Sequence, residues 1–214
     1  MTVDAADAPG RRERKKQRTR DALARAALEL FTTKGFEATT VDEIAEAVDV
    51  SQRTFYRYYP AKEDVAFAVQ AISEDHFVEA LRARPAHEAP FEAMRNAMLA
   101  AWDTIEEAVG EVVPVELHMR TYQVIESTPA LLAVRIRRSL ETEEKIARIL
   151  AAREGLDLDT DPRPRIAVAA FGSAMQVADR IWNARGDHSR EAIRAIAADC
   201  LDQLRPAVAE SWRT

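Results

Sequence analysis

The segment from Thr39 to Lys62 constrains the fold more than any other part of the chain. Thr40 is followed three residues later by Glu43, the capping-box pattern that starts a helix, and apolar residues at helical spacing come next. Asp49-Val50-Ser51 forms a turn, after which the Ser51 hydroxyl is placed to cap a second helix on the amide of residue 53 or 54. The segment therefore predicts two short helices joined by a tight turn.

The second of these helices, expected over residues 52–59, has one apolar and one polar side. Phe55 and Tyr59 are about one turn apart and should point inward, and Pro60 ends the helix. The outward residues are then Gln52, Arg53, Thr54, Tyr56 and Arg57. Gln and Arg side chains bond base edges in a bidentate way, while Thr and Tyr hydroxyls suit phosphate oxygens. This pattern predicts a helix that reads DNA.

A strongly basic run, RRERKKQRTR, occupies residues 11–20 with seven bases and one acid. Standing alone it would be a solvated charge run about as often as a binding surface, but its place ahead of a helix-turn-helix favours contacts with phosphates or a minor groove. We expect residues 1–18 to be a disordered basic arm and Lys62 to meet a further phosphate. The predicted DNA-binding residues are Arg18, Arg20, Thr40, Ser51, Gln52, Arg53, Thr54, Tyr56, Arg57 and Lys62.

The charge distribution agrees with this assignment although the net charge is −6. Residues 11–62 hold 12 Lys/Arg against 8 Asp/Glu, whereas residues 65–214 hold 18 Lys/Arg against 24 Asp/Glu. A basic N-terminal part on an acidic body indicates that only the N-terminal part faces the polyanion.

The whole chain predicts an all-α fold of about nine helices. Beyond the helix-turn-helix segment, helical periodicity with Gly and Pro interruptions indicates helices over residues 19–34, 62–84, 91–109, 114–126, 129–153, 163–185 and 190–212. We expect three parts: an arm over residues 1–18, a DNA-binding domain over residues 19–64, and a ligand-binding and dimerisation domain over residues 65–214.

The two C-terminal helices carry wide small or apolar faces, and residues 163–185 are rich in Ala, Gly and Ser. Small residues let another helix approach closely, so these two helices predict a four-helix interface between two chains. The alternative, that both faces are used inside one monomer, remains open.

Methionine and aromatic residues from several helices of the body predict an adaptable apolar pocket with a few polar groups. Taken singly, each of these residues is more often ordinary core. As a set they predict a small-molecule effector site between the helices of residues 91–185. The predicted lining is Met94, Met98, Trp102, Leu117, His118, Tyr122, Phe171, Met175 and Trp182.

Other classes of protein find little support. The sequence contains no GxGxxG, P-loop, HExxH or GxSxG motif, and its four histidines are too far apart for a local metal motif, so neither an enzyme nor a cofactor is expected. The single cysteine, Cys200, excludes an intrachain disulfide and favours a small apolar role. Without a long apolar run or a signal-type segment, we expect a cytoplasmic protein without a membrane partner.

Residues 19–63 resemble the N-terminal domain of the TetR family of bacterial transcriptional regulators, over about a fifth of the chain. The matching residues are Thr19-Arg20, Ala26-Ala27, Leu30-Phe31, Gly35-Phe36, Thr39-Thr40-Val41, Ile44-Ala45, Val50-Ser51, Thr54-Phe55-Tyr56-Arg57-Tyr58 and Lys62-Glu63. The resemblance implies an all-α homodimer that binds a palindromic operator, usually as a repressor released by a small ligand. It places the dimer interface in the two C-terminal helices.

Two residues depart from the family pattern. Asp49 stands where the family usually has Gly, and Asp tolerates a left-handed backbone better than most other residues. Tyr59 stands where Phe is more usual, so its hydroxyl needs a partner or solvent.

The body resembles, more loosely, the family members that bind acyl-CoA-like ligands, through residues 120–131 and Asp161-Pro162-Arg163. We therefore expect a ligand-responsive repressor whose effector is a small apolar or amphipathic compound. Two alternatives are a DNA-binding regulator whose ligand promotes binding and a dimeric scaffold without a ligand.

Overall fold

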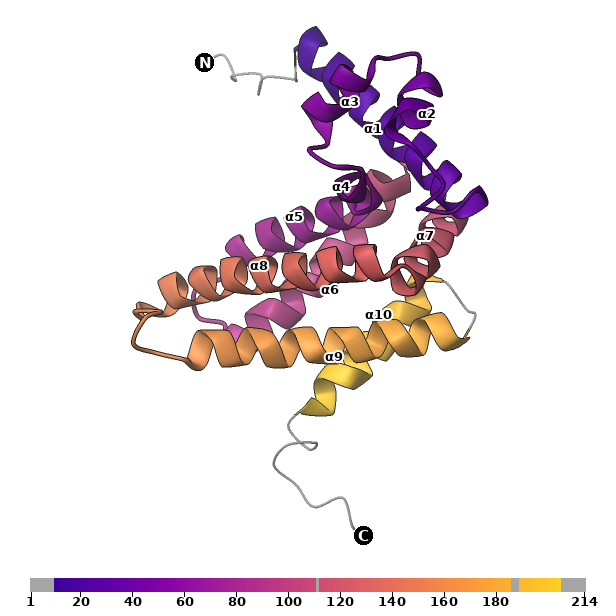
Figure 1. Ribbon diagram of the computed structural model, residues 1–214. Coiled ribbons are helices and arrows are strands. Elements are labelled where there is room, and N and C mark those ends of the chain that lie inside the picture. The colour runs from indigo at the N-terminus through magenta and orange to yellow at the C-terminus, as the bar shows by residue number, and fades with distance from the viewer. Residues whose placement is uncertain (1–9, 111, 186–188, 205–214) are drawn as a thin grey trace, which may run out of the picture. The chain divides into compact units, whose positions relative to one another are not determined.

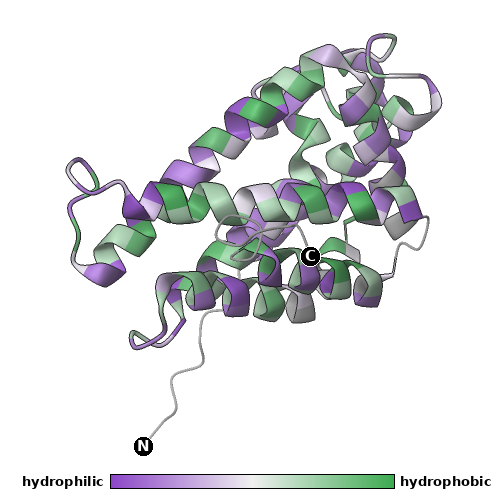
Figure 2. Cartoon of the chain, turned by 90° about the horizontal axis from the view of Figure 1, so that it is seen from below, coloured by the Kyte–Doolittle hydropathy of each residue, from purple (hydrophilic) through white to green (hydrophobic). Residues whose placement is uncertain are grey.

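The computed structural model describes residues 10–110, 112–185 and 189–204, and this part of the chain contains ten helices and no strand (Figure 1). The all-α prediction is confirmed. Most of the helices are amphipathic, and hydrophobic and hydrophilic bands follow one another along them (Figure 2). The chain divides into two compact units, one within residues 1–70 and 109–135 and the other within residues 71–108 and 136–214.

The first unit contains the helix-turn-helix. Its helices are α1 (Arg11–Thr33), α2 (Val41–Glu46), α3 (Gln52–Tyr58), α4 (Lys62–Ala66) and α7 (Val115–Ser127). α1 packs against α2, α4 and α7, and α2 packs against α3. The apolar side of α1, formed by Leu23, Ala24, Ala27, Leu28 and Phe31, is fully buried. α1 therefore packs against three of the four other helices of this unit.

α1 begins at Arg11, earlier than the expected start at Thr19, so residues 11–18 are helical rather than a disordered arm. Arg, Lys and Gln are good helix formers, and pairs one turn apart support the extension. Lys16 forms an ion pair with Glu13 at 3.2 Å, and Gln17 donates a hydrogen bond to Asp21 at 2.7 Å. The basic run is therefore the first part of α1.

The helix expected over residues 62–84 is broken. α4 ends at Ala66, and α5 (Ala68–Arg82) begins after Phe67, whose backbone departs from helical geometry at φ −101° and ψ 11°. The Phe67 amide bonds to the Asp64 carbonyl at 3.2 Å, a tightened last turn, and its ring is 1% exposed. Because apolar residues continue across the break, periodicity alone does not indicate it.

The second unit contains most of α5, α6 (Pro90–Gly110) and α8 (Pro129–Glu154), together with α9 (Arg163–Arg185) and α10 (Arg190–Asp202). Its core centres on Phe171, whose ring stacks on Phe77 at 6.0 Å and meets Phe91 edge to face at 5.8 Å. α9 and α10 pack against each other. Arg153 donates to the backbone carbonyls of Arg84 and Pro85, both at 2.9 Å, and so holds the end of α5.

The other boundaries agree with the sequence-based prediction to within one or two residues. Gly35 and Gly155, which were expected to stop helices, both adopt positive φ, at 92° and 65°. The last part of the helix expected over residues 190–212 lies outside the described residues. Among the described helices, none is long and apolar enough to cross a membrane. The predicted three-part functional division remains a prediction; the compact units place residues 109–135 with the N-terminal segment.

We expect Phe171→Ala to reduce the free energy of unfolding by about 3–5 kcal/mol, because it removes a buried ring that contacts two other aromatic rings, those of Phe77 and Phe91. Leu140→Ala is the control, since Leu140 is 61% exposed and should change stability by less than about 0.5 kcal/mol. Urea unfolding followed by circular dichroism measures both. Equal effects of the two substitutions would contradict the assigned core.

Candidate DNA interface

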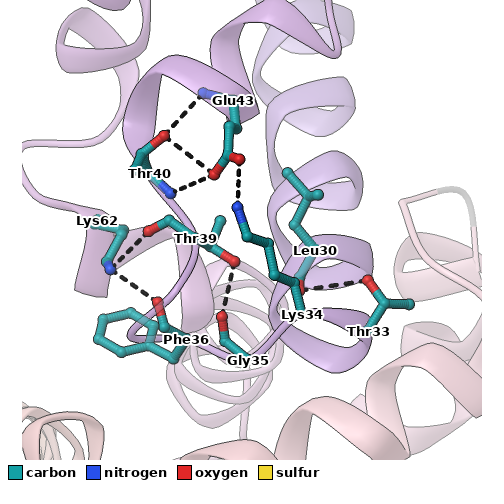
Figure 3. Close-up of polar contacts among 9 residues, drawn as sticks. All are labelled: Leu30, Thr33, Lys34, Gly35, Phe36, Thr39, Thr40, Glu43 and Lys62. Carbon is teal, nitrogen blue, oxygen red and sulfur yellow. Dashed lines mark hydrogen bonds and ion pairs between the residues drawn. The ribbon is translucent and has the colours of Figure 1, made fainter.

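The start of α2 is fixed by a complete capping box (Figure 3). The Glu43 amide donates to the Thr40 hydroxyl at 3.2 Å, and the Glu43 carboxylate accepts from the Thr40 amide at 2.9 Å. Lys34, at the end of α1, forms an ion pair with the same carboxylate. The Lys34 bond, followed by the Thr40 amide bond, lowers the pKa of Glu43 to about 2. α2 is thereby joined to α1 as well as capped.

Lys62 holds the loop between α1 and α2 (Figure 3). Its ammonium donates to the backbone carbonyls of Phe36 at 2.8 Å and Thr39 at 2.9 Å, and it lies 4.1 Å from the centre of the Phe36 ring. The buried Thr39 hydroxyl donates to the Gly35 carbonyl at 2.8 Å. The predicted contact of Lys62 with a phosphate stays a prediction, and two of its three N–H donors are used within the protein.

The turn between α2 and α3 is made by Asp49, which is the one non-glycine residue with positive φ (53°) in the described part of the chain. The Val50 amide bonds back to the Ala45 carbonyl at 3.0 Å, which closes the end of α2. This is a left-handed helix end, for which Gly is the usual residue. The position therefore requires a residue that tolerates positive φ, and Asp is among the few residues other than Gly that do so.

α3 has the predicted two sides. Ser51 caps it by accepting from the Thr54 amide at 3.2 Å, and Phe55 and Tyr59 are 0% and 3% exposed. The opposite side exposes Gln52, Arg53 and Arg57, with Tyr56 at 49% exposure. Because burial of the two aromatic rings fixes the rotation of the short helix, the polar side chains are held toward solvent.

Tyr59 finds the partner that its extra hydroxyl requires. The hydroxyl donates to the Arg20 carbonyl at 3.2 Å, and the Arg20 guanidinium lies 5.7 Å from the centre of the Tyr59 ring. Burial is the main cause that raises the pKa of Tyr59. At the same end of α3, the Arg57 guanidinium lies 5.0 Å from the centre of the Tyr58 ring. The last turn of α3 is therefore attached to α1 at Arg20.

The predicted DNA-binding residues all belong to the first unit. Arg18, Arg20, Thr40, Ser51, Gln52, Arg53, Tyr56 and Arg57 are exposed, whereas Thr54 and Lys62 are partly buried. Two of the hydroxyls in this set cap helices, Thr40 at α2 and Ser51 at α3. The Thr54 hydroxyl lies within hydrogen-bond distance of the Ser51 hydroxyl. These hydroxyls therefore shape the helix ends in addition to any contact with phosphate.

An acidic hollow that was not predicted from the sequence lies beside the start of α3. Asp42, Glu46 and Asp49 line it together with Ser51 and Gln52. All three carboxylates are exposed. Because carboxylates repel phosphate, this hollow limits where a DNA strand can pass. Acidic residues at positions 42, 46 and 49 follow helical spacing, a signal that could have revealed this cluster.

The predicted effector residues fall into separate groups. In the second unit, Met94 and Phe171 are buried in the main core, and Met98 and Met175 pack against it. Trp102 and Trp182 pack with Met175 against a smaller cluster around Ala178.

In the first unit, Leu117 is buried, and His118 and Tyr122 line a cavity of about 10 Å³ together with Leu28 and Val69. That volume holds about one water molecule. Burial lowers the pKa of His118, which favours the neutral imidazole. No His, Cys, Asp or Glu residues of the described segments gather in a group of three or more that could hold a metal ion.

Comparison with known proteins identifies the family to which the chain is similar. Residues 23–69 match the model described as bacterial regulatory proteins of the tetR family, and residues 88–209 match the MftR C-terminal domain. The chain is 45% identical over 212 residues to the HTH-type transcriptional regulator TcmR of Streptomyces glaucescens, covering 99% of this chain and 94% of TcmR. It is 33% identical over 96 residues to RutR of Escherichia coli K12, 45% of each chain.

Solved structures share the fold. A transcriptional regulator from Pseudomonas aeruginosa PAO1 matches with a TM-score of 0.56 at 16% identity, over 94% of each chain. A TetR-family regulator from Rhodococcus matches with a TM-score of 0.54 at 16% identity, over 88% of this chain and 98% of the other.

The fold and the exposed side of α3 define a helix-turn-helix DNA-binding transcriptional regulator. The chain belongs to the TetR family, as the N-terminal and C-terminal family matches and the identity to TcmR together show. Its relatives are transcriptional regulators rather than enzymes.

We expect acid to weaken the link between α1 and α2. The pKa of Glu43 is about 2 in the folded protein against an ordinary value of 4.5, so its stabilising effect is present above pH 4.5 and is lost as the pH falls toward 2. Glu43→Gln should therefore flatten the dependence of the melting temperature on pH between 5 and 2. Thermal denaturation at several pH values measures this, with the exposed Glu37→Gln as the control. Identical pH profiles for Glu43→Gln and the wild type would contradict the assignment.

Substitutions at Asp49 test the left-handed turn. Asp49→Val should reduce the free energy of unfolding by about 1–2 kcal/mol, because a β-branched residue is strained at positive φ. Asp49→Gly should leave stability equal or higher, since Gly adopts this conformation without strain. Urea unfolding distinguishes the two, and a fully stable Asp49→Val would refute the argument.

Proposed function

We propose that the protein is a ligand-responsive transcriptional repressor of the cytoplasm. In this proposal it binds a palindromic operator as a homodimer, places α3 in the major groove, and is released by a small apolar or amphipathic effector. The observation that carries the proposal is the exposure of Gln52, Arg53 and Arg57 on a helix whose opposite side is fixed by Phe55 and Tyr59.

Base reading is assigned to the first two residues of α3. Gln52 and Arg53 stand in the first turn, where a recognition helix meets base edges, and both side chains can make bidentate contacts. Arg57 was a third candidate, but its guanidinium lies against Tyr58 at the other end of the helix. We therefore assign Arg57 to the DNA backbone in preference to the bases.

Dimerisation is assigned to α9 and α10. α9 buries Val168, Phe171 and Ala174 on one side while Ile166 and Val177 remain 63% and 42% exposed. Exposed apolar residues on a long helix favour an interface with a second copy. Two α3 helices of one dimer would then enter successive major grooves, about 34–36 Å apart.

The effector residues are assigned in two groups, each within one unit. In the second unit, Met94, Met98, Met175 and Phe171 supply adaptable apolar side chains. In the first unit, α7 supplies His118, a partly buried polar group. We propose an acyl-CoA-like compound as the effector. The effector must bind the non-binding form better than the DNA-competent form.

The alternatives make different predictions. A regulator whose ligand promotes binding would bind operator only after the ligand is added. A dimeric scaffold would show no salt-dependent binding to DNA upstream of its own gene. Three experiments distinguish the ligand-released repressor from these two alternatives. Bound sequences are selected from random DNA, and compounds extracted from the purified protein are identified by mass spectrometry. Those compounds are then tested for release of the protein from DNA. Recovery of a palindrome supports the dimer, and recovery of no sequence refutes the operator proposal.

Arg53→Ala should relax base preference and cost about 1–3 kcal/mol of binding free energy on the preferred operator, because one bidentate contact is lost. Lys62→Ala should weaken binding to all sequences about equally and also destabilise the loop that it holds. Binding to a panel of operator variants measures the difference. An unchanged preference in Arg53→Ala would remove this residue from base reading.

A further inference from the structure

Arg53 and Arg57 lie one turn apart on α3, so their side chains leave the helix on the same side. Both residues are exposed, and Arg53 is the one assigned above to base edges. An arginine guanidinium can make a bidentate contact with guanine from either position. By its place on the helix alone, Arg57 would therefore be a second base-reading residue beside Arg53.

The Arg57 side chain instead bends toward its neighbour, Tyr58. Its guanidinium carbon lies 5.0 Å from the centre of the Tyr58 ring, and its Nη2 donates to the Tyr58 hydroxyl at 3.4 Å. Successive residues of a helix are rotated by about 100°, so this contact turns the charge of Arg57 away from the side that carries Arg53. It also separates two like charges that repel each other at a spacing of one turn.

The backbone on both sides of Tyr58 is held in place, so its ring has a defined position. Tyr58 is the last residue of α3 and is partly buried. Before it in the chain, the Phe55 ring is fully buried. After it, the Tyr59 hydroxyl donates to the Arg20 carbonyl at 3.2 Å, and the ring of Pro60 restricts the backbone further. The longer and more flexible Arg57 side chain is thus the partner that adapts to the ring.

The charges beside α3 differ between its two ends. Asp42, Glu46 and Asp49 expose carboxylates next to the start of the helix. Arg57 is the basic residue of its last turn. Phosphate is repelled at the first end and attracted at the second. A guanidinium turned aside at the last turn is therefore placed for the DNA backbone, and the base edges are left to the first turn.

We propose that Tyr58 is a positioning residue for base specificity, because it keeps the Arg57 guanidinium off the base edges and limits base reading to the first turn of α3. An exposed cation–π contact corresponds to a preference of about two- to fivefold for the held position. Without the ring, Arg57 extends beside Arg53 and meets the bases as well. This inference rests on the proposed placement of α3 in the major groove.

A freed Arg57 would read a defined base pair. Residues 53 and 57 are separated by about 6 Å of helix axis, and successive base pairs by about 3.4 Å. The freed guanidinium would thus reach a base pair about two steps from the one that Arg53 reads. Guanine is expected there, because its O6 and N7 atoms accept two N–H groups of one arginine.

The test uses full-length variants that separate the ring, the hydroxyl and the arginine. Y58F keeps the ring and removes the hydroxyl, whereas Y58L removes the ring. R57Q/Y58L also removes the guanidinium, with R57Q as its reference. Sequences bound by each protein are selected from random DNA, and binding to the wild-type operator is measured against salt concentration. Circular dichroism checks that each variant is folded, and Y58M replaces Y58L if the latter unfolds.

Wild type and Y58F should select the same sequences, whereas Y58L should add a preference for guanine about two base pairs from the contact of Arg53. For each α3 bound, Y58L should hold the wild-type operator about two- to fivefold more weakly. The slope of log K against log salt should fall by about 0.9 for each α3, since one phosphate contact is lost. R57Q and R57Q/Y58L should select the same sequences as each other.

The same change of preference in Y58L and in R57Q/Y58L would show that Tyr58 does not act through Arg57, and would overturn the proposal. So would a Y58L variant that selects the wild-type sequences with an unchanged salt slope. A wild type that selects no sequence and shows no salt-dependent binding would instead refute the DNA-reading role on which the inference rests.

Discussion

The ammonium of Lys62, bonded to two carbonyls of the loop between α1 and α2, is the contact on which the geometry of the DNA-binding unit depends. It joins the start of α4 to that loop, and the ion pair of Lys34 with Glu43 joins α1 to α2 on the other side. α3 has only seven residues and could not keep its orientation alone. Its exposed side is useful only because these polar links and the buried Phe55 ring hold it in place.

Local signals made the helix-turn-helix predictable. The capping box at Thr40, the Ser51 cap and the inward Phe55 and Tyr59 are encoded within a few residues of one another, and the structure confirms each of them. What escaped prediction depends on residues far apart in the chain. The hydroxyl of Tyr59 finds the Arg20 carbonyl, and Lys62 finds the loop carbonyls, only after the chain has folded.

The ends of the helices likewise divide into those set by local sequence and those set by tertiary packing. Gly35 and Gly155 stop helices as expected because positive φ is a local property. The break at Phe67 carries no local signal, since burial of its ring is decided by tertiary packing. The early start of α1 was missed because the basic run was interpreted as a disordered arm, whereas Glu13 and Asp21 contact side chains one turn away and support a helix. Pocket residues are the hardest to predict from the sequence, because the same apolar residue types line a pocket and fill the core.

α7 belongs to the same compact unit as the DNA-binding helices, and this bears on how an effector could act on them. Arg25 of α1 donates to the Val112 carbonyl at 2.9 Å, just ahead of α7, and α7 packs against α1. His118 and Tyr122, two of the predicted effector residues, belong to α7 and line the same small cavity as Leu28 of α1. In the proposed mechanism, an effector that displaces α7 would therefore act on α1 directly. Because α1 carries both Arg20, against the end of α3, and the basic extension, such a displacement would affect base reading and backbone contact together.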